Sequence, residues 1–98
     1  MPRRTRVHVD GLPLHIVQRG HNRGACFFDD QDRLAYLVWL REALERERCR
    51  LHTYVMMANH VRRLLTPEHA ARVPQVLVSV GRCYVQYVNR TYGRTGAL

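Results

Sequence analysis

Residues 51–67 read LHTYVMMANHVRRLLTP, and this stretch decides the fold. Two apolar runs, residues 51–57 and 60–66, are separated by the short polar connection Ala58-Asn59. Val, Tyr, Thr, Leu and Met favour a pleated, half-buried strand, and Asn favours a turn. We therefore predict an antiparallel hairpin whose second strand begins at His60.

His60 and Arg62 stand two positions apart on the second predicted strand. Side chains with that spacing project from the same face of a sheet. An imidazole there offers a lone pair to a metal, and a guanidinium offers paired donors to a phosphate. We expect any functional site to be centred on this pair.

The totals describe one small basic domain, residues 1–98, with 46% hydrophobic residues. Sixteen basic against eight acidic residues give a net charge of +8 and a pI near 10.4. Such a balance indicates a polyanionic partner, more often nucleic acid than a membrane surface. Every basic residue is Arg, which suits bidentate phosphate contacts, although a GC-rich coding bias produces the same composition.

The compartment expected from the sequence is the cytoplasm. Cys26, Cys49 and Cys83 are an odd number of widely spaced cysteines without a C-x-x-C pair. This pattern is typical of reduced thiols in the cytoplasm. The longest apolar run, residues 35–40, is too short to span a bilayer. The basic start lacks a following apolar segment, so we expect no secretory signal and no membrane partner.

Periodicity predicts a strand and two helices around the hairpin. The strand runs from Leu12 to Arg19, a helix from about Asp30 to Arg48 follows an Asp cap, and another begins near Pro74 and ends before Gly93. For the first helix we expect a buried face of Leu34, Leu37, Val38 and Leu44, widened by Tyr36, Trp39 and Leu40. For the second we expect Val73, Val76, Leu77, Val80, Tyr84, Val85 and Val88.

The resulting order, β-α-β-β-α, predicts an α+β domain. We expect a ferredoxin-like or RRM-like antiparallel sheet with its helices packed on one face, lacking the final strand of those folds.

Several arginines are candidate nucleic-acid contacts. Arg3, Arg4 and Arg6 form either an arm along a phosphate backbone or a frayed terminus. Arg19 and Arg23 flank the glycines of a loop that favours an anion. Arg82 and Arg90 share the polar side of the second helix with Ser79, Gln86 and Asn89, a side that either contacts DNA or is simply solvated.

The chain also resembles a known family, the REP-associated tyrosine transposases, which belong to the insertion-sequence-200-like single-tyrosine (HUH) transposases. The likeness runs nearly end to end and is carried by Pro2-Arg3-Arg4, residues 19–23, residues 27–30, the stretch CRLHTYVMMANHV at residues 49–61, LLTP at 64–67, GRCYV at 81–85 and NRTYGRTG at 89–96.

The resemblance implies binding and cleavage of single-stranded hairpin DNA in transposition and DNA recombination. In the family a helix tyrosine attacks the scissile phosphate, and a divalent metal, Mg²⁺ or Mn²⁺, stabilises the transition state. It implies a cytoplasmic, nucleoid-associated bacterial protein that recognises REP elements as its partner, and it allows for a homodimer.

Two departures qualify the implied activity. The family holds its metal with two histidines around one hydrophobic residue; His60 and Val61 match, but Arg62 takes the second histidine position and offers no lone pair. The family's tyrosine helix, closing strand and third metal group lie beyond Leu98, so no catalytic residue is assigned.

Three accounts follow from these departures. We favour a decayed or truncated transposase that keeps DNA binding without cleavage. The second account is a non-catalytic DNA- or RNA-binding module in which Arg62 contacts phosphate. A third, weaker account keeps catalysis through one of the tyrosines present.

Overall fold

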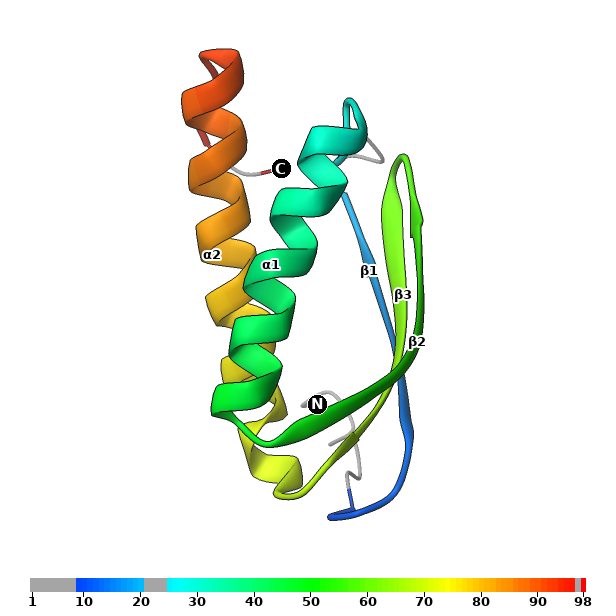
Figure 1. Cartoon of the computed structure of the whole chain (residues 1–98). Helices are drawn as coiled ribbons and strands as arrows, with labels where there is room; N and C mark the ends of the chain where they lie inside the picture. The colour runs from blue at the N-terminus through cyan, green and yellow to red at the C-terminus, as the bar shows by residue number, and fades with distance from the viewer. Residues whose placement is uncertain (1–8, 21–24, 97) are drawn as a thin grey trace, which may run out of the picture.

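A three-stranded antiparallel sheet carries both helices of the protein on one of its faces (Figure 1). The computed structural model describes residues 9–20, 25–96 and 98. The strands are β1 (Leu14–Arg19), β2 (Cys49–Met57) and β3 (His60–Pro67), in the order β1-β3-β2. The helices are α1 (Asp30–Arg46) and α2 (Val73–Tyr92), the latter preceded by the short 3-10 turn η2 (Ala70–Arg72). The predicted α+β fold and element order are confirmed.

The predicted hairpin is confirmed, with Met57 paired to His60 across the Ala58-Asn59 turn. Its tip also binds the chain between β1 and α1. Gly20 donates its N–H to the Asn59 carbonyl at 2.9 Å, and Cys26 donates to the Ala58 carbonyl at 2.6 Å. The hairpin tip therefore holds both sides of the connection that runs through residues 21–24.

The first strand starts at Leu14 instead of at Leu12, where the alternation of apolar residues predicted it. Residues 9–12 form a turn in which Leu12 donates its N–H to the Val9 carbonyl at 3.2 Å. Pro13 follows and has no N–H to offer a sheet. Leu12 is consequently 53% exposed.

Helix α1 begins as predicted but buries a different face. Asp29 caps the helix in a reciprocal capping box with Asp32. The helix ends at Arg46, two residues before the predicted Arg48, whose φ of 59° is incompatible with a helix. Leu34 and Val38, predicted to be buried, are exposed. The buried residues are Asp32, Tyr36, Leu40, Ala43 and Leu44.

Helix α2 follows its prediction closely. It buries Val73, Val76, Val80, Tyr84 and Val88 against the sheet and α1, with Leu77 half-buried at the border. The chain leaves the helix at Gly93, where φ is 65°, a left-handed value that glycine adopts without strain. The rings of Phe27, Tyr36 and Tyr84 pack together where α1, α2 and the loop after β1 meet.

A buried carboxylate, Asp32, joins the start of α1 to the end of α2. It accepts hydrogen bonds from the Tyr87 hydroxyl at 2.9 Å, the Tyr92 hydroxyl at 2.8 Å and the Phe28 N–H at 2.8 Å. Burial by itself would raise the pKa of Asp32, but these hydrogen bonds outweigh it and hold the pKa below its usual value. The two helices are thus tied by a charged group that the protein keeps ionised.

The three cysteines, Cys26, Cys49 and Cys83, are free thiols. Over the described ranges, neither helix has the length and apolar content needed to cross a bilayer.

Candidate nucleic-acid interface

His60 and Arg62 lie on the same face of β3, as their spacing predicted. Val61, Arg63, Leu65 and Pro67 are buried toward the helices, so the alternate residues point the other way. We call this side of the sheet the outer face. Its residues, taken from the strand pairing, are His15, Val17 and Arg19 on β1, His60, Arg62, Leu64 and Thr66 on β3, and Arg50, Thr53, Val55 and Met57 on β2.

The strand register arranges this outer face in rows. His60 lies between Arg19 on β1 and Met57 on β2. In the next row, Arg62 lies between Val17 and Val55. Each row therefore places an apolar side chain beside a cationic one, a combination that contacts both the bases and the phosphates of an unpaired strand.

A bulge in β2 brings a further histidine to the same side. The pairing with β3 skips a residue between Leu51 and Thr53, which leaves His52 as the extra residue. The His52 Nε2 atom lies 2.6 Å from the Thr66 Oγ1 atom. His52 and Thr66 thereby mark the end of the outer face that lies away from the hairpin turn.

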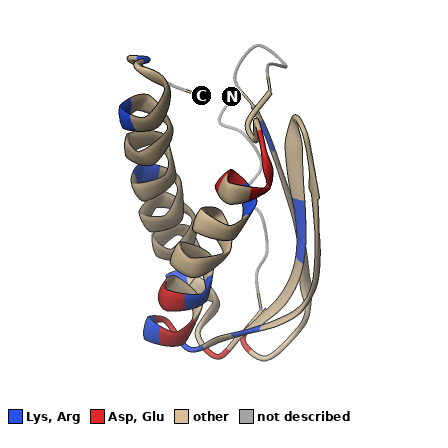
Figure 2. Ribbon diagram, turned by 45° about the horizontal axis from the view of Figure 1, so that its top comes forward, with Lys and Arg blue, Asp and Glu red and all other residues tan. Residues whose placement is uncertain are grey.

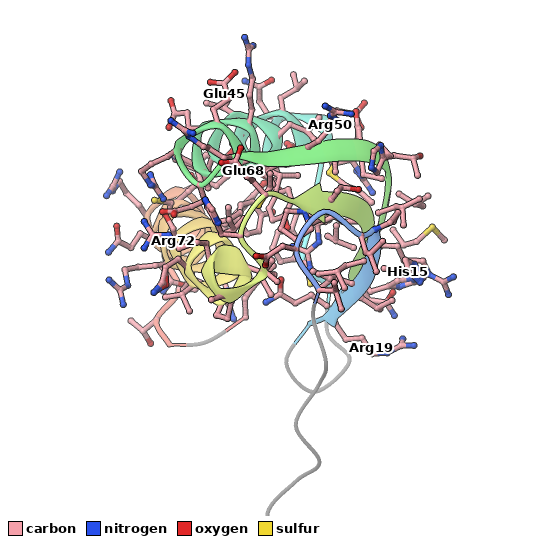
Figure 3. All side chains as sticks on the ribbon, turned by 90° about the horizontal axis from the view of Figure 1, so that it is seen from below. His15, Arg19, Glu45, Arg50, Glu68 and Arg72 are labelled. Atoms are coloured by element: carbon pink, nitrogen blue, oxygen red, sulfur yellow. The ribbon has the colours of Figure 1, made fainter. Side chains whose placement is uncertain are left out.

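The outer face carries positive charge and has no acid of its own; the nearest, Glu68, shares a surface pocket with Arg50 and Thr66 at its end and is ion-paired with Arg48. The three strands contain no Asp or Glu, and the acids lie at residues 10, 29–47 and 68 (Figure 2). Among the described residues, the ion pairs are made by Arg33, Arg41, Arg46, Arg48, Arg72 and His69. Arg19, Arg50 and Arg62 of the outer face are in none of them. Figure 3 shows His15 and Arg19 directed away from the helices, whereas Glu45 and Arg72 lie on the helix side.

Three apolar side chains on the outer face are exposed to solvent. Val17 is 40% exposed, Val55 is 48% and Met57 is 49%. Isolated exposed apolar residues are common, but these three occupy the two rows of His60 and Arg62. They form a small apolar surface framed by arginines.

The surroundings of His60 do not fit a divalent cation. Its Nδ1 atom lies 2.8 Å from the Asn59 side-chain oxygen, and Arg19 and Arg62 are its neighbours on the outer face. Two guanidiniums repel a dication and supply no lone pair. Within the described part of the chain, no three residues of the His, Cys, Asp or Glu types gather closely enough to hold a metal.

The tyrosines lie on the helix side of the sheet. Tyr36, Tyr84, Tyr87 and Tyr92 belong to the helices, and Tyr54 pairs with the inward-facing Arg63. The Tyr84 hydroxyl donates to the Cys26 carbonyl at 2.6 Å, and burial raises the pKa of Tyr84 well above its usual value. Hydrogen bonding to Asp32 raises the pKa of Tyr92 to about 12. These hydroxyls are poor nucleophiles at neutral pH because they remain protonated.

The predicted DNA contacts divide into three groups. Arg19 and Arg62 meet on the outer face. Arg82 and Arg90 are exposed on α2, on the other side of the sheet, so they belong to no common surface with the first pair. Arg3, Arg4, Arg6 and Arg23 lie outside the described residues.

Sequence reasoning missed Arg50 and His52 as members of the outer face, whereas the alternation along the first strand already predicts that His15 shares a face with Arg19. Arg50 is out of phase with Thr53, Val55 and Met57, and it shares their face only because the bulge shifts the alternation along β2. His52 reaches that side only because of the bulge, which the sequence does not announce.

Comparison with known protein families, with curated proteins and with solved structures finds no match.

Proposed function

We propose that this protein binds single-stranded or hairpin DNA through the outer face of its sheet and does not cut it. The observation that carries the proposal is the set of Arg19, Arg62 and Arg50, which are spread from one end of the outer face to the other on strands that contain no acidic residue. Guanidiniums without carboxylate partners are available to phosphate oxygens.

The choice of DNA rests on the resemblance to the single-tyrosine transposases, and so does a proposed location at the bacterial nucleoid. The choice of an unpaired strand or loop rests on the apolar residues Val17, Val55 and Met57, because the faces of unpaired bases are free for apolar contact, whereas those of a duplex are stacked inside it.

The absence of cleavage rests on the charge around His60 and on the state of the tyrosines. A phosphodiester bound beside Arg62 has its charge neutralised, but no described hydroxyl with a lowered pKa lies on that face to attack it. The protein is accordingly a binding module built on a transposase-like fold.

The test compares two triple variants that lose the same charge. The outer-face variant replaces Arg19, Arg50 and Arg62 by Gln. The control replaces by Gln three arginines of the helices, Arg41, Arg82 and Arg90. Fluorescence anisotropy measures the affinity of each variant for a labelled hairpin and for a labelled unpaired strand, at salt concentrations from about 20 to about 200 mM.

We expect the outer-face variant to lose affinity on the order of 100-fold at low salt and to lower the salt slope by about three. The helix-side control should change affinity by no more than about threefold. Equal losses of affinity in the two variants would show that net charge alone drives binding. An affinity that does not change with salt concentration would contradict the proposal.

A further inference from the structure

Arg63 is a charged side chain in the interior of the protein. It lies on the helix side of β3, between Val61 and Leu65, and is only 1% exposed. No described carboxylate forms an ion pair with it. A buried cation without an anion costs free energy, because neutral hydrogen-bond partners replace only part of the hydration that it loses.

The hydrogen bonds of Arg63 leave one edge of its guanidinium poorly occupied. Nη1 donates to the Tyr36 hydroxyl at 2.7 Å, a short and strong contact. Nη2 reaches only the neutral Gln18 side-chain oxygen, at 3.2 Å. Nε is buried and meets no protein acceptor.

Nε and Nη2 point from the same edge of the guanidinium plane. That edge is one of the two forks by which arginine binds both oxygens of a carboxylate at once. In this protein the fork makes one hydrogen bond, the long one from Nη2 to Gln18, and Nε makes none. An anion bound at this edge would therefore give both nitrogens an acceptor.

A cavity of about 120 Å³ lies at the edge of the sheet, between β1 and α2, and Arg63 itself does not line it. Both hydrogen-bond partners of Arg63, Gln18 and Tyr36, are part of its wall. The rest is mainly apolar, with Phe27, Val61 and Val85 among the lining residues. Because Gln18 is exposed and β1 is an edge strand, its side chain is free to swing aside.

We propose that Arg63 and this cavity form a binding site for a small aliphatic carboxylate. The carboxylate displaces the Gln18 amide oxygen and accepts hydrogen bonds from Nε and Nη2, while Tyr36 keeps Nη1. The hydrocarbon part fills the apolar cavity, whose volume is comparable to cavities that hold benzene. The cavity lies at the edge of the sheet and is also lined by Arg19, so the site adjoins the outer face at that edge.

The first experiment uses butyrate as the probe and butyramide as its uncharged control. Sodium butyrate is compared with sodium chloride at equal ionic strength, and the Tm of the intact protein is measured by circular dichroism. We expect butyrate to raise Tm by roughly 5 °C once it exceeds its dissociation constant about tenfold. Butyramide should leave Tm unchanged, and equal shifts from the two compounds would overturn the proposal.

Two variants locate the effect at Arg63. Arg63→Leu removes the charge and should abolish the response to butyrate. Gln18→Glu places a carboxylate where the ligand's would be, so it should raise Tm at pH 7 without any ligand and should also abolish the response. An undiminished response in Gln18→Glu, with Tm unchanged or lowered, contradicts the proposal even if Arg63→Leu fails to fold.

Discussion

Arg19 lies directly across from His60, with the two Cα atoms in register on neighbouring strands. The imidazole that the transposase resemblance assigns to a metal therefore has a guanidinium opposite it and a second one, Arg62, two residues along its own strand. Such surroundings attract a phosphate and repel a metal ion.

The variant Arg62→His creates the histidine pair of the transposases that the sequence resembles, but we expect it to create no cleavage activity. We expect no covalent protein–DNA adduct on a hairpin substrate with Mg²⁺ or Mn²⁺, because the described tyrosines are held on the helix side and Tyr92 and Tyr84 have raised pKa values. A denaturing gel of labelled DNA after incubation is the measurement. A shifted band would mean that one of the tyrosines of this chain acts as a nucleophile.

The variant Val55→Glu should weaken DNA binding by on the order of tenfold at low salt, because a carboxylate beside Arg62 competes with phosphate. Val38→Glu is its matched control, since Val38 is similarly exposed, at 54% against 48%, but lies on α1. Anisotropy with the same hairpin compares the two. Equal losses would place the DNA elsewhere than on the outer face.

The variant Asp32→Ala should lower the free energy of unfolding by about 3 kcal/mol, because it leaves the Tyr87 hydroxyl and the Phe28 N–H without their acceptor and removes the capping box. Asp30→Ala is the control, because the Asp30 side chain is 98% exposed. It should cost less than about 0.5 kcal/mol. Urea unfolding at pH 7 measures both, and similar costs would refute the structural role of Asp32.

Asp32 also predicts how stability changes in acid. Its pKa in the folded protein lies below that of an unfolded aspartate, about 3.9. The ionised Asp32 side chain therefore stabilises the folded protein at pH values above the unfolded pKa. This contribution is lost as the pH falls through the pKa of Asp32 in the folded protein. Urea unfolding between pH 7 and pH 2 should show this loss, and Asp32→Asn should remove part of it. An identical pH profile in Asp32→Asn would contradict the assignment.

The sequence predicted the hairpin and α2 well because each has one dominant period. The alternation around His60 and the apolar spacing of α2 leave little choice of face. Helix α1 was harder, because apolar residues occur around most of its circumference. Its buried face is chosen by contacts distant in sequence, above all the packing of Tyr36 against Tyr84.

The burial of Arg63 and the hydrogen bonds of Asp32 were not predicted from the sequence, for two different reasons. The alternation that sends Arg62 outward also sends Arg63 inward, so its burial was implicit in the predicted strand, although charge argues against it. The partners of Asp32 could not be foreseen, since Tyr87 and Tyr92 lie 55 and 60 residues away along the chain.

The fastening of the hairpin tip has a practical consequence for engineering. Gly20 and Cys26 both bind the turn, so the two ends of the intervening segment are fixed independently of what joins them. A longer or different linker at this place would still join two fixed ends. The entropic cost of closing such a loop rises only slowly with its length. This connection is accordingly the place to insert a fluorophore tag or an affinity epitope next to Arg19 while leaving the sheet intact.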